Sequence, residues 1–286
     1  MKNVFAIAIL GAVTALPLIA QPQPPAFKTP RVSPKQVLTQ TVGLTEVTIT
    51  YSRPGVKNRP VWGGLVPYDK VWRTGANEAT NIAFSDDVMI NGQALPKGTY
   101  SLHTIPGQTE WTLIFNKTAN QWGSFTYDAA QDALRVKVRP QAASMVEWMM
   151  FDVPDLAMDK ATFELRWEKL AVPFTVSTNT SQKVLAEARA AVAAAKADDW
   201  RTPMRAAQFA DEAGLARDDA AKWLDASIKA QENINNLYLK ARMQSKAGDR
   251  AGAIATAERA IAKGTDKDKE EIEEIRKNIA VWKMTK

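Results

Sequence analysis

The sequence predicts an α+β multidomain protein, in which an antiparallel β-sandwich of jelly-roll or barrel-like form precedes a small tetratricopeptide-like α-helical domain. Residues 35–177 contain short alternating apolar segments separated by turn signals, a pattern typical of half-buried strands. Residues 178–286 are rich in alanine, and their apolar period lengthens towards that of a helix. The change of pattern therefore places a domain boundary near residue 177.

The first segment, residues 1–20, has the pattern of a secretory signal peptide. Lys2 precedes an apolar run that ends at Ala20, and cleavage is expected near that residue. Pro17 and the lack of flanking positive charge argue against a membrane anchor. Residues 21–34 are a proline-rich linker. We therefore expect a periplasmic or secreted protein with no transmembrane segment in the mature chain.

The strands of the β domain are predicted from alternation and turns. Val47, Ile49 and Tyr51 alternate with threonines, and Leu134, Val136 and Val138 alternate with basic residues. The dipeptide Asn91–Gly92 between apolar flanks is a strong hairpin signal. Further strands are expected at WTLIFN, VEWMMF, FELRW and PFTV. In total the domain should contain nine to eleven short strands.

The stretch from Tyr51 to Thr80, YSRPGVKNRPVWGGLVPYDKVWRTGANEAT, has no sustained hydrophobic period. Its prolines and glycines exclude a long helix or a central strand. It is therefore predicted to be an irregular loop that presents aromatic and guanidinium groups, and such loops are often functional.

A ligand-binding site is predicted around this loop. Arginines would bind carboxylate or carbonyl groups, aromatic rings would stack on a ligand, and Asn77 and Glu78 would fix its orientation. Three readings remain open: ligand binding, carboxylate catalysis by Glu78 with Arg73, or an internal Arg73–Glu78 ion pair that locks the loop. The candidate residues are Arg53, Trp62, Tyr68, Trp72, Arg73, Asn77, Glu78, Asn116 and Trp122.

The tryptophans of the β domain divide into two groups by their local pattern. Trp111, Trp148 and Trp167 occur in strand patterns and are expected in the core. Trp62, Trp72 and Trp122 occur in loop-like sequence, where they either face a polar ligand with apolar surfaces, such as a sugar or peptide, or staple the loops onto the sandwich.

Several chemistries find little support in the sequence. His103 is the sole histidine and cysteine is absent, so multi-histidine or cysteine zinc sites cannot be assembled. His103 is expected with Thr99 and Ser101 on the strand face opposite Tyr100 and Leu102, and a Ser-His-Asp triad would have to use it without a GxSxG motif. Calcium would need acids such as Asp86 and Asp87, or Asp152 and Asp155, but no EF-hand loop is present. We expect no metal and no cofactor.

Nucleic acid is also not expected as a partner. The formal net charge is +6, but the basic residues are distributed over both halves and balanced by acids. Binding to phosphates requires concentrated positive charge.

The helical half contains an internal repeat. The dipeptide Ala213–Gly214 recurs as Ala247–Gly248. Ala220 corresponds to Ile254, and Ala226 corresponds to Ala260. The common offset of 34 residues is the period of tetratricopeptide helical hairpins. Each glycine is expected to end the first helix of its hairpin. An array of two repeats is short, so this tail is expected to pack on the β domain or on a protein partner.

The chain resembles a family of exported bacterial proteins known as domain of unknown function 2911. The resemblance rests on the loop sequence above, followed by INGQALPKGTYSLHTIPG, EWTLIFNK and QWG, and it extends from about Ser33 to Val176. Family members often have a signal peptide and a helical tail. This chain departs from the family pattern at Gly55, Asn58 and His103, where Ser, Gly and an aromatic residue are more usual. The resemblance implies the architecture but no reaction, substrate or catalytic residue.

These observations favour an exported, non-catalytic protein that binds a polar ligand, either a glycan or a peptide, or an extracytoplasmic protein partner. The helical tail would be its second interaction surface. The alternative is a hydrolase or lyase that uses Glu78 as a carboxylate and Arg73 as an electrostatic stabiliser.

Overall fold

The computed structural model describes residue 27 and residues 29–284. The chain divides into two units, Met1–Val32 and Ser33–Lys286, and all described helices and strands belong to the second. The predicted signal peptide and half of the predicted linker lie outside the described residues.

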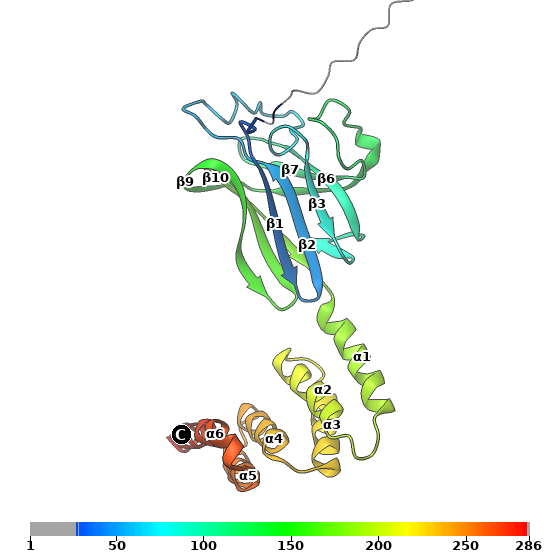
Figure 1. The fold of residues 1–286 in the computed structure, drawn as a ribbon, viewed down its shortest axis with the longest axis vertical. Coiled ribbons are helices and arrows are strands. Elements are labelled where there is room, and N and C mark those ends of the chain that lie inside the picture. The colour runs from blue at the N-terminus through cyan, green and yellow to red at the C-terminus, as the bar shows by residue number, and fades with distance from the viewer. Residues whose placement is uncertain (1–26, 28, 285–286) are drawn as a thin grey trace, which may run out of the picture. The chain divides into compact units, whose positions relative to one another are not determined.

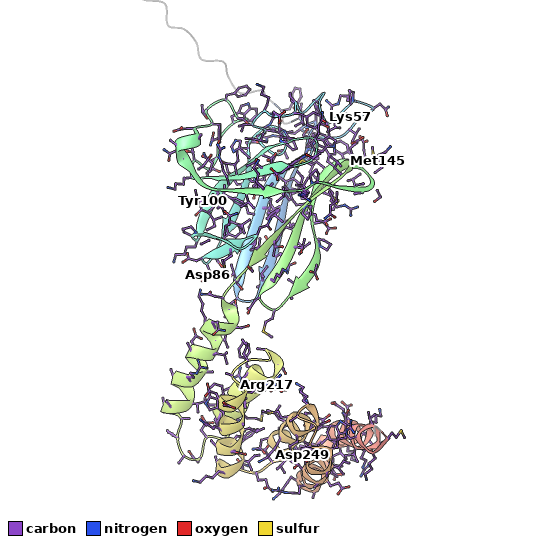
Figure 2. The ribbon with its side chains drawn as sticks, turned by 180° about the vertical axis from the view of Figure 1, so that it is seen from behind. Lys57, Asp86, Tyr100, Met145, Arg217 and Asp249 are labelled. Atoms are coloured by element: carbon purple, nitrogen blue, oxygen red, sulfur yellow. The ribbon has the colours of Figure 1, made fainter. Side chains whose placement is uncertain are left out.

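In the part of the chain that the structure describes, ten antiparallel strands form two sheets, which confirms the predicted fold class (Figure 1). The first sheet has six strands in the order β1-β2-β3-β6-β7-β8, and the second has four in the order β5-β4-β10-β9. Figure 2 labels Tyr100 of β6 in the first sheet and Met145 of β9 in the second. The first sheet consists of β1 (Lys35–Val42), β2 (Thr45–Ser52), β3 (Thr80–Phe84), β6 (Gly98–Ile105), β7 (Trp111–Asn116) and β8 (Asp132–Val138). The second consists of β4 (Val88–Ile90), β5 (Gln93–Leu95), β9 (Gln141–Ala157) and β10 (Lys160–Ser177).

Alternation along the strands places the apolar residues inside, as the sequence predicts. In β2 the side chains of Val47 and Ile49 are fully buried, whereas the intervening threonine is less buried. The predicted hairpin at Asn91–Gly92 is confirmed, because Ile90 pairs with Gln93 across it. Asn91 and Gly92 both have positive φ angles, 46° and 80°, and the tight hairpin turn requires that backbone conformation at both positions.

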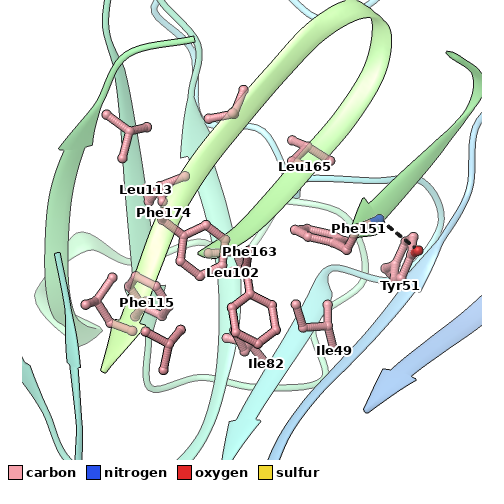
Figure 3. Packing of buried hydrophobic residues seen from close by; sticks show 14 of the residues in the cluster. Ile49, Tyr51, Ile82, Leu102, Leu113, Phe115, Phe151, Phe163, Leu165 and Phe174 are labelled. Atoms are coloured by element: carbon pink, nitrogen blue, oxygen red, sulfur yellow. Dashed lines mark hydrogen bonds between the residues drawn. The ribbon is translucent and has the colours of Figure 1, made fainter. Parts of the chain in front are cut away.

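The core lies between the two sheets. Leu102, Leu113 and Phe115 of the first sheet meet Phe163, Leu165 and Phe174 of the second in one buried cluster (Figure 3). The rings of Phe163 and Phe174 stack with centroids 5.7 Å apart. At one edge, the Tyr51 hydroxyl accepts a hydrogen bond of 2.9 Å from the Phe151 amide. One continuous apolar layer therefore joins both sheets.

Strands β9 and β10 differ from the expectation of short strands. They form one long hairpin of 17 and 18 residues, and FELRW and PFTV both fall within β10. Three irregularities in the register, between Thr162 and Leu170, interrupt the pairing without ending it. Bulges of this kind bend a strand and restart its alternation, so a single bent strand resembles two strands in sequence.

Between residues 178 and 284 the described helical region contains six α-helices. Helices α2 and α3 form one hairpin, and α4 and α5 form a second one. Gly214 and Gly248 follow α2 and α4 with φ angles of 66° and 87°, so the prediction that each glycine ends the first helix is confirmed. The helices are α1 (Thr180–Ala194), α2 (Arg201–Glu212), α3 (Arg217–Ala230), α4 (Ile234–Lys246), α5 (Arg250–Lys263) and α6 (Lys269–Met284).

The repeat is 34 residues long in the first helices but 33 in the second helices. Buried Ala207 of α2 corresponds to buried Ala241 of α4 at the longer offset. In α3 and α5 the buried positions correspond at 33 residues: Ala220, Trp223, Leu224 and Ser227 match Ala253, Thr256, Ala257 and Ala260. The predicted equivalences Ala220–Ile254 and Ala226–Ala260 are therefore wrong by one residue, because the turn after Gly214 is one residue longer.

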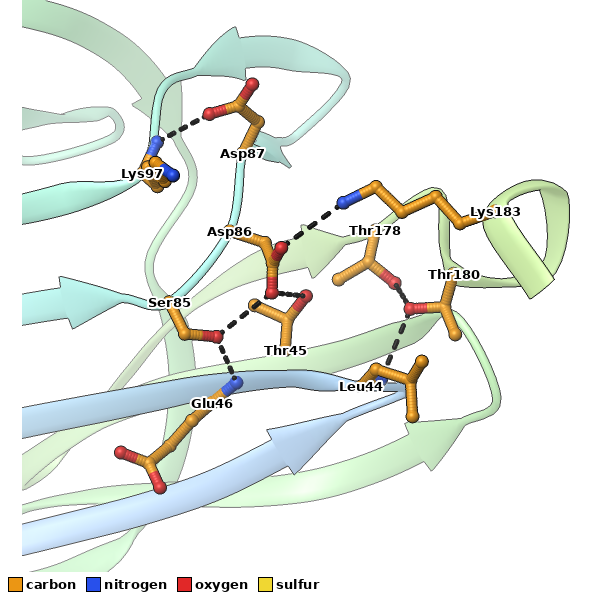
Figure 4. Close-up of polar contacts among 10 residues, drawn as sticks. All are labelled: Leu44, Thr45, Glu46, Ser85, Asp86, Asp87, Lys97, Thr178, Thr180 and Lys183. Carbon is orange, nitrogen blue, oxygen red and sulfur yellow. Dashed lines mark hydrogen bonds and ion pairs between the residues drawn. The ribbon is translucent and has the colours of Figure 1, made fainter. Parts of the chain in front are cut away.

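Polar contacts join the start of α1 to the turns of the β domain (Figure 4). Thr180 Oγ1 accepts a hydrogen bond of 3.2 Å from the Leu44 amide, and Lys183 Nζ lies 3.2 Å from Asp86 Oδ1. The Asp159 carboxylate accepts from the Ser181 amide. A carboxylate at this position satisfies amides that the first turn of a helix leaves unpaired. The beginning of α1 is therefore fixed to the β domain.

Candidate functional site

The loop from Tyr51 to Thr80 contains no helix and no long strand, and it is hydrogen-bonded to both sheets. Next to β9, the Val56 amide donates to Glu147 O, and the Met149 amide donates to Pro54 O. Next to β6, Trp72 and Thr104 exchange two backbone hydrogen bonds of 2.8 and 2.9 Å. The loop is thus an ordered segment with regular backbone pairing at its contacts.

Four tryptophans pack together beneath this loop. Trp62 lies edge-on to Trp72, Trp111 and Trp167, with ring centroids 5.9, 4.9 and 5.6 Å away. Trp72 stacks on Trp167 at 5.9 Å, and its Nε1 donates to Gly75 O. We call these four residues the tryptophan cluster. Trp111 and Trp167 are core residues, as predicted. The sequence left two roles open for Trp62 and Trp72, contact with a ligand or attachment of the loop to the sandwich. In the structure both rings pack on Trp167, so they attach the loop to the sandwich.

Trp148 was expected in the core, and that expectation is wrong. Its side chain is 39% exposed, and Lys57 Nζ lies 5.7 Å from its ring centroid. Met149 and Phe151 of the same strand are buried. Because side chains alternate between the faces of a strand, the burial of Met149 directs Trp148 outward.

Two of the predicted binding residues make contacts that hold the loop. Arg53 donates from Nε to Met149 O at 2.7 Å and from Nη2 to Trp148 O. Tyr68 covers Gly63, where an added Cβ would lie 2.8 Å from the Tyr68 ring. These contacts join the loop to β9 and close its own turn.

Asn116 is fully buried and is saturated by hydrogen bonds within the chain. Its Nδ2 donates to Asp128 O and to Asp132 Oδ1, both at 2.8 Å. Its Oδ1 accepts from the Thr118 amide at 3.0 Å. Asn116 therefore fixes the base of the segment that follows β7.

Arg73 is partly buried, and its Nε has no hydrogen-bond partner among the described residues. Burial lowers the pKa of its guanidinium, and no carboxylate of the described chain offsets that effect. The Arg73–Glu78 ion pair considered from the sequence stays a prediction.

Two loops that are distant in sequence lie side by side and contain Asn77, Glu78 and Trp122. Glu78 and Trp122 form an antiparallel backbone bridge. The Ala79 amide donates to Gln121 O at 2.8 Å, and the Gly123 amide donates to Asn77 O at 3.1 Å. We call residues 75–81 and 117–126 the paired loops. Asn81 Nδ2 adds a hydrogen bond of 2.8 Å to Asn120 Oδ1.

The paired loops expose two aromatic rings. Trp122 is 60% exposed and Phe125 is 85% exposed. Between them, Gly123 has a φ angle of 66°, and a Cβ added there would lie 2.7 Å from the Phe125 ring. Phe125 was not among the predicted site residues, although the sequence QWGSF places an aromatic residue on each side of a glycine turn.

His103 lies beneath the second of the paired loops. It is fully buried, and its ring is 5.2 Å from that of Tyr127. The backbone of Ser101 and Gly123 lies near the imidazole, but neither ring nitrogen makes a well-aligned hydrogen bond. Burial lowers the pKa of His103, so the ring is held neutral. It lies on the face opposite Leu102, as predicted, but a ligand in solvent cannot reach it.

Tyr127, Asp132 and Arg135 stabilise the end of the same loop. The Tyr127 hydroxyl donates to Asp132 Oδ2 at 2.7 Å, and Arg135 donates to both partners at 2.7 and 2.8 Å. Burial, followed by the Asp132 carboxylate, raises the pKa of Tyr127 to about 12. This network and Asn116 give the loop a rigid base.

The paired loops form a surface with exposed rings and neighbouring amide groups, which are suited to stacking and hydrogen bonding. Among the described residues no group of three or more His, Cys, Asp or Glu side chains could hold a metal ion. No described helix has the length and apolar character needed to span a membrane.

By its fold the protein is of the class in which a β domain of two sheets is followed by helical hairpins. The chain belongs to the family described as "Protein of unknown function (DUF2911)", whose model matches residues 33–176. That range covers all ten described strands except the last residue of β10, Ser177, and includes both paired loops. Searches of curated proteins and of solved structures find no match to the chain.

Proposed function

We propose that this protein is an exported, non-catalytic binding protein whose paired loops bind a glycan. The supporting observation is the exposure of Trp122 and Phe125, 60% and 85%, on loops held by backbone and amide hydrogen bonds. Large exposed apolar side chains often mark interaction sites. Because the loops are already ordered, binding would require little further loss of conformational freedom.

The chemistry of the surface favours a sugar. Aromatic rings can pack against the apolar faces of a sugar ring, while the amide groups of Asn77 and Asn120 hydrogen-bond its hydroxyl groups. A peptide is the second ligand class in this proposal. The predicted signal peptide would direct export and be cleaved near Ala20, and the mature protein would be periplasmic or secreted.

The helical region would supply a second surface for a protein partner. A groove of about 550 Å³ is lined by α2, α4 and the start of α6. Glu271 in this groove has a pKa raised by burial and by the nearby carboxylates of Asp268 and Glu274. These acids would favour a basic partner segment.

Glycan and peptide arrays probed with the full chain test the proposal. Trp122→Ala and Phe125→Ala should each weaken glycan binding by about tenfold, which corresponds to about 1.4 kcal/mol. Trp148→Ala is the matched control, because Trp148 is an exposed tryptophan that lies outside the paired loops. Glycan binding that survives in the Trp122→Ala/Phe125→Ala double variant would overturn the assignment of the site.

The same arrays address the alternative of carboxylate catalysis. Cleavage of a bound glycan or peptide by the wild type, lost in Glu78→Gln, would favour a hydrolase or lyase. Binding without turnover supports the binding protein.

A further inference from the structure

A cleft of about 550 Å³ lies between the two helical hairpins and is lined by α2, α3 and α4. Its volume falls in the range typical of small-molecule sites. We call it the inter-hairpin cleft. Alanines form much of its wall, and these small side chains leave room between the hairpins. The apolar lining consists of Ala210, Ala220, Ala221, Leu224, Met243 and Ala247.

Charged side chains lie at the two ends of the cleft. Along α3 the lining begins at Arg217 and ends at Asp225, where Lys240 Nζ lies 2.8 Å from Asp225 Oδ1. At the end that contains Arg217, Lys246 Nζ lies 2.6 Å from Asp211 Oδ2. The rise of a helix from residue 217 to residue 225 is about 12 Å. An extended alkyl chain of about eight carbons, with bonds of about 1.5 Å, has a similar length.

Arg217 gives the cleft its net charge of +1, because three cations line it against two carboxylates, Asp211 and Asp225. Lys240 and Lys246 are paired with these carboxylates. The Arg217 side chain, by contrast, has no ion pair or hydrogen bond to any described residue (Figure 2). A guanidinium can bind a carboxylate through two parallel hydrogen bonds. The unpaired charge therefore favours an anionic head group at this end of the cleft.

The acids next to Arg217 in the sequence do not line the cleft. Asp218 and Asp219 follow it in the first turn of α3. Asp219 is paired with Arg189 of α1, with 2.9 Å between Oδ2 and Nε. Because residues one and two positions apart on a helix do not face each other, these two acids leave Arg217 available to a ligand in the cleft.

We propose that the inter-hairpin cleft binds an aliphatic monocarboxylate, independently of the paired loops. The alkyl chain would pack on the apolar lining, where the flexible Met243 side chain can adjust to its shape. The carboxylate would accept hydrogen bonds from Arg217. A ligand with an ammonium head group would meet the Arg217 charge and would find both carboxylates of the cleft already paired. Because Arg217 is exposed, solvent screens its charge, and the alkyl chain supplies most of the affinity.

Titration of the full chain with n-octanoate, n-octanol and n-octylamine, observed by NMR, tests the head group. Octanoate should bind about fivefold more tightly than octylamine, with octanol between them. Added salt should narrow the difference, because it screens the Arg217 charge. Equal affinity for octanoate and octylamine at low salt, or no binding of octanoate, would overturn the proposal.

The length of the alkyl chain tests the apolar lining. Octanoate has two CH₂ groups more than hexanoate, and each CH₂ that is buried in the cleft should tighten binding by up to about fourfold. Octanoate should therefore bind up to about sixteenfold more tightly than hexanoate. Equal affinities would mean that the chain does not enter the cleft, and the proposal would be wrong.

Arg217→Gln tests the assigned partner of the carboxylate. It should weaken octanoate binding about fivefold and leave octanol binding unchanged. Lys222→Gln is the matched control, because it removes the same charge from an exposed position on α3 that does not line the cleft. Octanoate affinity equal to that of the wild type in Arg217→Gln would show that Arg217 does not hold the head group.

Two further variants on α3 test the location. Ala221→Phe fills the cleft and should weaken octanoate binding at least tenfold. Ala226→Phe is the matched control, because Ala226 is exposed on the same helix and does not line the cleft. If both variants bind octanoate like the wild type, the cleft is not the site. Glycan binding should be the same in all four variants, so this proposal and the function proposed for the paired loops can fail separately.

Discussion

Trp62 and Trp122 are the same residue type in loops of one domain, but their surroundings are opposite. Trp62 contacts three other tryptophans at ring-centroid distances of 4.9 to 5.9 Å, whereas Trp122 is 60% exposed. Burial of an aromatic side chain stabilises the fold, and an exposed ring contributes little to folding and remains available to a ligand. The environment of each residue therefore decides its role.

Trp62→Ala and Trp122→Ala should separate these roles. Removing Trp62 leaves a cavity in the tryptophan cluster and should lower the free energy of unfolding by about 3 kcal/mol. Trp122→Ala should change it by less than about 0.5 kcal/mol, as for most surface substitutions. Urea denaturation of both variants measures the difference. A large loss of stability in Trp122→Ala would show that this ring supports the fold.

His103 couples stability to pH. Its pKa in the folded protein is lowered, chiefly by burial, so near the ordinary histidine pKa of about 6.5 the unfolded chain binds more protons than the folded chain. The stability due to the neutral ring is fully present above about pH 6.5 and is lost as the pH falls below it.

His103→Phe should remove this contribution. As the pH falls from 7.5 to 5, the free energy of unfolding of the wild type should decrease by up to about 1.4 kcal/mol per pH unit more than that of the variant. Urea denaturation at several pH values measures both slopes, and the variant serves as the reference for all other titrating groups. Equal slopes would mean that His103 does not titrate differently in the two states.

At the scale of elements, the turn between β1 and β2 meets the first turn of α1. Gly43 has a φ angle of 62°, and a Cβ added there would lie 2.4 Å from Thr180 Oγ1 and 3.0 Å from Met158 O. The next amide, that of Leu44, donates to Thr180. Glycine permits both the positive φ angle and the close approach of α1.

Gly43→Ala should therefore destabilise the protein by about 3 kcal/mol, the sum of backbone strain and overpacking. Gly92→Ala is the matched control, because Gly92 also has a positive φ, 80°, but nothing lies within 4 Å of an added Cβ. That control should lose only about 1 kcal/mol. Chemical denaturation gives both values, and equal losses would contradict a close contact between Gly43 and α1.

At the scale of the whole molecule, the buried apolar side chains of the described residues fall into one β cluster and two helical clusters. The β cluster contains residues between Val42 and Val176. The two helical clusters contain residues between Leu185 and Ile279. No cluster combines residues from both ranges, so the strands and the helices each bury apolar side chains of their own.

A shortened protein of residues 33–178 should therefore fold alone. We expect a cooperative urea transition and a near-ultraviolet circular dichroism signal from the tryptophan cluster like that of the full chain. Loss of the bonds that α1 makes to Leu44 and Asp86 should lower its stability by about 1 to 2 kcal/mol. A non-cooperative transition would show that the helices are needed to complete the β domain.

The candidate site could be predicted only in part. The position of Trp122 in loop sequence and the neighbouring amides suggested an exposed ring, and the structure places Asn77 and Glu78 beside it. The same reasoning applied equally to Trp62 and Trp72, which are staples, and to Asn116, which is buried. It also missed Phe125. Local composition identifies a loop, but the burial of each side chain depends on contacts between residues far apart in sequence.

The sequence by itself determined the fold class, the alternating strands, the Asn91–Gly92 hairpin, the helix-ending glycines and the family. These features depend on local periodicity and turn chemistry, which a single chain segment specifies. The tertiary structure alone decided the two-sheet order, the bent β9–β10 hairpin, the tryptophan cluster, and the pairing of residues 75–81 with 117–126. These depend on packing between distant segments, which no local pattern of residues specifies.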